Sequence, residues 1–145
     1  MFKNINKKRK RGFTLIELVI VLAVLAIIAL IAIPNFTKVR NDSLQKADAR
    51  TGEQIEKITL MAIANQDIIV PTSGTISVNV GEKGKIDKES ASMFPSNTEK
   101  ESYKKMIQEV KKPQVNGKTE YTVIVDDKGS VNVTYSDGTS ITGTK

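Results

Sequence analysis

The residues best suited to chemistry lie near the amino terminus, where Gly12 and Phe13 precede a single carboxylate, Glu17. The basic residues before Gly12 are Lys3, Lys7, Lys8, Arg9, Lys10 and Arg11, and no acidic residue lies among them. After Glu17 the chain is apolar from Leu18 to Ile33. A carboxylate in a bilayer is unfavourable by roughly 2.5 kcal/mol or more unless it is paired or near the interface. Glu17 is therefore a candidate functional residue.

The segment Gly12-Phe13-Thr14-Leu15-Ile16-Glu17-Leu18 resembles the class III signal of type IV prepilins and their pseudopilin relatives. This resemblance implies that a prepilin peptidase cuts after Gly12 and that the new amino-terminal residue, Phe13, is N-methylated. It also implies that Glu17 pairs with the charged amino terminus of Phe13 in a neighbouring subunit. An ordinary secretory signal is instead removed together with its apolar segment.

The excess positive charge lies entirely in residues 1–12, which we interpret as a cleaved basic leader. The whole chain has 22 Lys and Arg against 16 Asp and Glu, a formal charge of +6. Subtracting the six basic residues of the leader leaves 16 of each sign. Positive charge before a span favours a cytoplasmic amino terminus. The balanced remainder does not favour nucleic acid as the main partner.

Residues 13–34 are expected to form one transmembrane or filament-core helix. From Phe13 to Ile33 only Thr14 and Glu17 interrupt the apolar run, and about 21 residues at 1.5 Å each match a bilayer core of about 30 Å. Pro34 follows at once, and a proline inside a helix removes a backbone hydrogen bond, so we expect a kink or local loosening there.

Residues 35–145 are expected to form a globular head that includes the second half of the long helix, which should continue to Ala64. Acid-first spacings of four residues predict ion pairs between Asp42 and Lys46 and between Glu53 and Lys57. Alternation and turn residues predict strands over 75–80, 121–125, 131–135 and 140–142, an exposed loop over 81–92, and a capped helix over 98–111. The fold class is α+β, with the long helix packed on a small antiparallel sheet.

Neither a metal nor another cofactor is expected. Asp126, Asp127 and Asp137 could offer oxygen ligands to calcium, as in some major pseudopilins, but their spacing fits ordinary hairpin turns. The chain has no cysteine and no histidine, so the head lacks disulfides and the commonest catalytic base and thiol nucleophile. The absence of a disulfide also favours a Gram-positive-like host among pilin-bearing bacteria.

These features predict a structural subunit of a type IV pilus, most simply a major pilin and not an enzyme. The resemblance implies a helical homo-oligomeric filament that serves adhesion, twitching or gliding motility, or biofilm formation. It also implies three partners: the prepilin peptidase, a polytopic platform protein and an assembly ATPase. The precursor would wait in the cytoplasmic membrane as a single-pass protein. Two alternatives remain open: a pseudopilin of a type II secretion or competence DNA-uptake system, and a membrane-anchored enzyme or ligand-binding domain.

Overall fold

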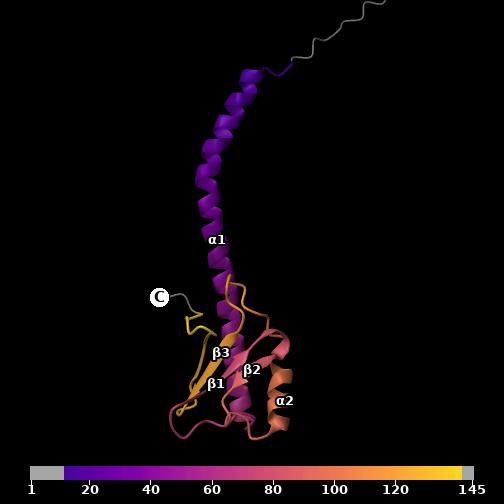
Figure 1. Cartoon of the computed structure of the whole chain (residues 1–145), viewed down its shortest axis with the longest axis vertical. Coiled ribbons are helices and arrows are strands. Elements are labelled where there is room, and N and C mark those ends of the chain that lie inside the picture. Colours follow the sequence, from indigo (N-terminus) through magenta and orange to yellow (C-terminus); the bar gives the residue numbers. More distant parts are fainter. Residues whose placement is uncertain (1–11, 142–145) are drawn as a thin grey trace, which may run out of the picture. The chain divides into compact units, whose positions relative to one another are not determined.

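A computed structural model describes residues 12–141 of the chain. The chain divides into two compact units, residues 1–39 and residues 40–145. Helix α1, Leu15–Ala64, supplies most of the described part of the first unit and is also the first element of the second (Figure 1). The predicted long helix is therefore confirmed, and it ends at Ala64 as expected.

The first unit presents its apolar side chains outward. The large hydrophobic residues between Phe13 and Ile33 are exposed, from 48% at Val21 to 83% at Phe13. By length and composition α1 could cross a membrane. Helical structure passes through Pro34 without a break, and the hydroxyl of Thr37 donates to the carbonyl of Ile33 at 3.1 Å. A kink at Pro34 stays a prediction.

The second unit is the head, and its sheet has four antiparallel strands in the order β2-β1-β3-β4. The strands are β1 (Thr75–Val80), β2 (Ile86–Glu89), β3 (Tyr121–Asp126) and β4 (Val131–Tyr135), with a short 3-10 turn, η1 (Glu82–Gly84), between the first two. Helix α2 (Asn97–Met106) lies between β2 and β3 in sequence. The expected α+β fold is confirmed.

The core forms between the inner face of the sheet and the two helices. Alternate residues of β1 and β3 are buried and stand in register, as Ile76 with Val125 and Val78 with Val123. Ile55 and Ala62 of α1 and Tyr103 of α2 complete this cluster. Thr59 of α1 and Tyr103 of α2 are joined by a hydrogen bond of 2.9 Å between their hydroxyls. The helices therefore cover the same face of the sheet.

The prediction of a loop over residues 81–92 is wrong, because β2 pairs with β1 inside that segment. Residues Ile86–Glu89 are mostly exposed, and only Ile86 is partly buried. An edge strand of this kind is held by backbone hydrogen bonds, so it shows none of the apolar alternation by which strands are recognised in sequence.

Two other element boundaries differ from expectation. Helix α2 begins after the predicted cap, with Ser96 accepting from the amide of Thr98 at 3.1 Å, but it ends at Met106 instead of residue 111. The chain turns there so that Ile107 and Val110 both enter the core. The strand predicted over 140–142 is only an isolated bridge between Ser140 and Thr134; Thr142 lies outside the described residues.

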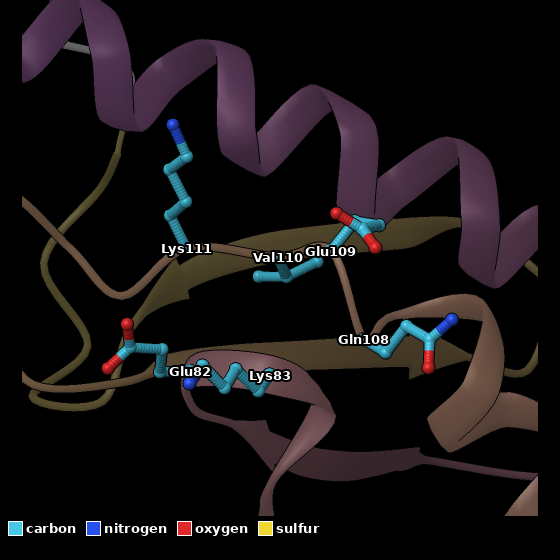
Figure 2. A pocket seen from close by; sticks show the side chains of 6 residues that line it. All are labelled: Glu82, Lys83, Gln108, Glu109, Val110 and Lys111. Carbon is cyan, nitrogen blue, oxygen red and sulfur yellow. The ribbon is translucent and has the colours of Figure 1, made fainter.

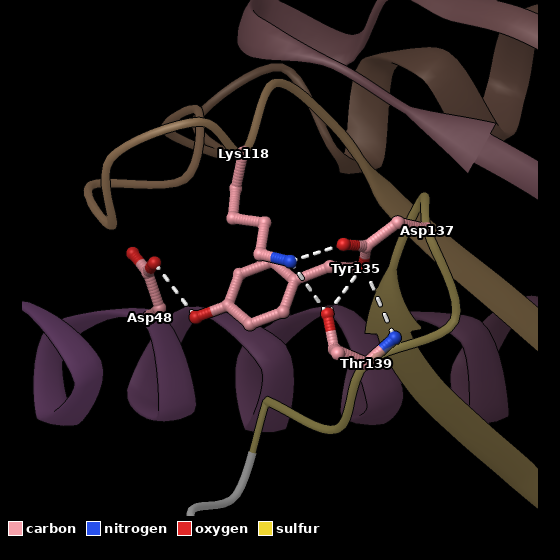
Figure 3. Close-up of polar contacts among 5 residues, drawn as sticks. All are labelled: Asp48, Lys118, Tyr135, Asp137 and Thr139. Carbon is pink, nitrogen blue, oxygen red and sulfur yellow. Dashed lines mark hydrogen bonds and ion pairs between the residues drawn. The ribbon is translucent and has the colours of Figure 1, made fainter.

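The buried carboxylate of Asp48 in α1 links this helix to β3, to β4 and to the segment that precedes β3. Its Oδ1 accepts from the amide of Gln114 at 2.7 Å and from the hydroxyl of Tyr121 at 3.2 Å. Its Oδ2 accepts from the amide of Val115 at 3.1 Å and from the hydroxyl of Tyr135 at 3.0 Å (Figure 3). Asp48 has no exposed surface. Four donors therefore replace the water that a carboxylate needs.

The turn that follows β4 is fastened by side chains beside this carboxylate. The ammonium of Lys118 pairs with Asp137, donates to the hydroxyl of Thr139 at 2.7 Å and lies 5.1 Å from the ring centre of Tyr135 (Figure 3). Hydrogen bonds from Lys118 and Thr139 lower the pKa of Asp137 below its usual range. These contacts hold the turn in a chain without disulfides.

Replacing Asp48 should weaken the head more than replacing any one of its donors. In Asp48→Asn the amide nitrogen cannot accept, so donors facing it stay unpaired, and we expect a loss of roughly 2–4 kcal/mol of unfolding free energy. The matched variant Tyr135→Phe removes one donor and should lose about 1 kcal/mol. Thermal melting of the full chain in detergent, followed by near-ultraviolet circular dichroism, measures both. Equal losses of unfolding free energy in the two variants would contradict the central role of Asp48.

Alkaline pH should destabilise the head through its three tyrosines, all of which are buried. Burial raises the pKa of Tyr103 to about 12, and burial with the adjacent Asp48 charge raises the pKa of Tyr121 and Tyr135. An unfolded tyrosine has a pKa of about 10, so stability should fall as pH rises above about 10, by up to roughly 1.4 kcal/mol per pH unit for each phenol. Phenolate absorbance is a direct readout, since the chain has no tryptophan. Phenolate absorbance that rises near pH 10 while the head stays folded would contradict the raised pKa values of the tyrosines.

Candidate functional site

The candidate site is the junction between the basic segment and the apolar helix. Gly12, Phe13 and Thr14 precede α1 and are exposed. A Cβ built on Gly12 would meet nothing within 4 Å. Residues 1–11, which hold the predicted leader's basic side chains, lie outside the described residues. The structure thus presents the predicted cleavage bond, Gly12 to Phe13, in an open segment just before the helix.

Glu17 closes the first turn of α1 through a reciprocal pair of contacts with Thr14. The amide of Thr14 donates to Glu17 Oε2 at 2.9 Å, and the hydroxyl of Thr14 donates to the same oxygen at 2.8 Å. In return, the amide of Glu17 donates to Thr14 Oγ1 at 3.3 Å. This is a capping box, in which two residues three apart satisfy each other's unpaired amides at a helix start.

The capping box changes how Glu17 should be understood. The resemblance implies that Glu17 pairs with Phe13 of a neighbouring subunit, and the structure also gives its carboxylate two donors from its own chain. The signal was present in the sequence, because Thr14 and Glu17 have the spacing of Ser96 and Glu99, whose cap was predicted. Among the described residues, Glu17 Oε1 accepts no hydrogen bond, so this oxygen is available to a partner.

The described residues of the head form open hollows at its surface. A hollow of about 490 Å³ lies between the η1 loop and the chain after α2, lined by Glu82, Lys83, Gln108, Glu109, Val110 and Lys111 (Figure 2). Figure 2 shows the side chain of Lys111 extending toward α1, away from Lys83. Lysines and carboxylates with no nucleophile beside a base do not form a hydrolytic arrangement.

Two of the three aspartates considered for calcium, Asp126 and Asp137, make hydrogen bonds within turns. Asp126 Oδ1 accepts from the amides of Lys128 at 2.9 Å and Ser130 at 2.7 Å. Asp137 is engaged by Lys118 and Thr139. Within residues 12–141 no group of three potential metal ligands comes together.

The fold and the junction together define a class: an apolar amino-terminal helix with a prepilin-type start, followed by a small α+β head. A family model described as the prokaryotic N-terminal methylation motif matches residues 7–33. The curated protein named prepilin peptidase-dependent protein A, from Clostridium perfringens (strain 13 / Type A), is 30% identical over 108 residues, which is 74% of each chain. No solved structure matches. The chain belongs to the type IV pilin-like prepilins.

Gly12 can be tested without disturbing the described fold. Because an added side chain would meet nothing within 4 Å, Gly12→Leu should leave the melting temperature unchanged. We expect it to block cleavage, so that the chain keeps residues 1–12 when its intact mass is measured from membranes. Wild-type chain from the same preparation is the control. A variant of mature mass would exclude Gly12 as the residue that the peptidase recognises.

Proposed function

We propose that this chain is a major subunit of a type IV pilus, polymerising into a surface filament for adhesion, motility or biofilm formation. One observation carries the proposal: within residues 7–33, which match the N-terminal methylation motif, α1 exposes its large apolar side chains from Leu15 to Ile33. Such a surface needs either lipid or other subunits around it, because exposed apolar patches of this size are unfavourable in water. The bilayer would cover it in the precursor, and neighbouring helices would cover it in the filament.

Moving the helix from lipid to filament leaves the hydrophobic free energy of the helix nearly unchanged, since its apolar area is buried in both states. Polar contacts must then supply the specificity. After cleavage, Phe13 would carry a positive amino group, and Glu17 Oε1 of an adjacent subunit is available to accept it. The cap made by Oε2 with Thr14 need not break. Pairing opposite charges in a low-dielectric core favours one register over its alternatives.

The same proposal covers processing and location. Residues 1–12 would be the cytoplasmic leader removed by a prepilin peptidase, residues 13–34 the membrane and later filament-core segment, and residues 35–145 the outward-facing head. Pro34 would allow α1 to bend during extraction from the bilayer. A platform protein and an assembly ATPase would drive that step, because a structural subunit supplies no energy source. No catalytic activity is proposed for the head.

The deciding experiment combines shearing of cells with intact-mass spectrometry of the released fraction. Abundant chain beginning at methylated Phe13 is the expected result. A processed chain that stays in the membrane would favour the pseudopilin of a secretion or DNA-uptake system, and an uncut chain would overturn both.

Two substitutions at Glu17 separate its cap from its charge. Glutamine also serves in a capping box, so Glu17→Gln should keep the helix start and normal cleavage yet release at least tenfold fewer filaments. Glu17→Val loses both the cap and the charge, and should likewise stay cleaved but unassembled. Quantifying sheared filaments against processed chain in membranes gives the comparison. Wild-type filament yield from Glu17→Gln would mean that the charge pair is dispensable.

A further inference from the structure

Asn116 and Gly117 form an exposed turn in the segment before β3, and they are the one Asn-Gly pair in the sequence. The amide of Lys118 closes the turn by donating to the carbonyl of Val115 at 3.2 Å. Gly117 has a φ of 81°, a left-handed conformation that glycine adopts without strain. A Cβ built on Gly117 would meet nothing within 4 Å. The pair is therefore open to water.

The two amides that could react with each other at this turn have no other partner. Among residues 12–141, neither the side-chain amide of Asn116 nor the backbone amide of Gly117 makes a hydrogen bond. Asn97 is exposed as well, but the next backbone amide, that of Thr98, donates to Ser96 Oγ at 3.1 Å. Threonine is also branched at Cβ, whereas glycine has no side chain to shield its nitrogen. The turn therefore places an accessible amide carbon beside an unengaged backbone nitrogen.

We propose that Asn116 is a site of self-modification, at which the side chain cyclises onto the backbone of Gly117 and is deamidated. The nitrogen of Gly117 attacks Cγ of Asn116, forms a C–N bond and loses its proton, while the Cγ–NH2 bond breaks and ammonia leaves. Water then opens the cyclic succinimide at one of its two carbonyls, which gives aspartate or isoaspartate. The attack needs no enzyme, because groups held side by side in one chain react at a high effective concentration.

The two products differ in their effect on the fold, because the turn lies between two anchored residues. On one side, the amide of Val115 donates to Asp48 Oδ2 at 3.1 Å, and on the other, Lys118 pairs with Asp137. Aspartate keeps the length of the backbone. Isoaspartate carries the chain through the former side chain and so adds one methylene group between the two anchors. We expect isoaspartate at position 116 to weaken the attachment of the turn to Asp48.

Ageing of the full chain in detergent at mildly alkaline pH, followed by peptide mass spectrometry, tests the site. The mass change from amide to acid should accumulate at Asn116 at least tenfold faster than at Asn97 in the same sample. Asn116→Gln is the matched control, since its longer side chain would have to close a larger ring, and it should convert at least tenfold more slowly. Equal rates at Asn116 and Asn97 would overturn the proposal. Conversion of Asn116 in urea but not in the folded chain would also overturn it, because the fold would then shield the turn.

Thermal melting separates the effect of the added charge from that of the added backbone atom. Aged wild-type chain that contains isoaspartate should melt several degrees below fresh chain, whereas Asn116→Asp, which gains only the charge, should melt like fresh wild type. Aged Asn116→Gln shows how much any other damage lowers the melting temperature. Wild-type chain that contains isoaspartate yet melts like fresh chain would overturn the link between this turn and Asp48.

Discussion

The head is organised around one buried charge. Asp48 has no exposed surface, and within residues 12–141 no cation forms an ion pair with it, so its four hydrogen bonds must compensate for the lost water. The donors come from the segment before β3, from β3 itself and from β4, all of them 66 to 87 residues further along the chain. The carboxylate therefore fixes the distance and rotation of the sheet on the second half of α1. In a chain without cysteine, this polar connection and the Lys118 contacts replace covalent closure of the carboxy-terminal region.

The spacing of apolar residues in the sequence predicted those helices and strands that bury one face at regular intervals. The strands β1 and β3 bury alternate residues, and α1 has a long apolar run followed by an amphipathic segment. The same reasoning fails where burial gives no pattern. Strand β2 is an exposed edge, and Asp48 looks like any surface aspartate until its partners are known. Phe36 and Ala47 of α1 are apolar yet exposed, while the small and polar residues Gly52 and Thr59 are buried. Gly52 leaves room for Ile141, whose Cδ1 would lie 3.1 Å from an added Cβ.

The candidate site was more accessible to sequence reasoning because its contacts are local. Gly12, Phe13 and Glu17 lie within six residues, and their order alone carried the resemblance to prepilins. What local spacing could not decide was which contacts form. Thr14 and Glu17 make a capping box three residues apart. Within residues 12–141 the two predicted ion pairs do not form, although their members are four apart: Asp42 with Lys46, and Glu53 with Lys57. The capping box forms because the first amides of a helix would otherwise lack hydrogen-bond acceptors. A surface ion pair gains little free energy, because pairing restricts two long side chains and so lowers their entropy.

In the proposed filament, cohesion and register would come from different side chains of α1. Apolar side chains of the first unit supply attraction to lipid or to like helices, but such contacts are non-directional and many alignments bury similar area. A filament with one repeating geometry needs a contact that changes sharply when a neighbour slides by a turn of helix. Point charges have that property in a dry core and at a crowded surface, because a shift of a few ångströms exchanges an opposite partner for a like one. In the proposed filament, Glu17 would supply that contact, because it is the one charged residue between Phe13 and Ile33. Register in this chain would then be set by charge, and cohesion by apolar area.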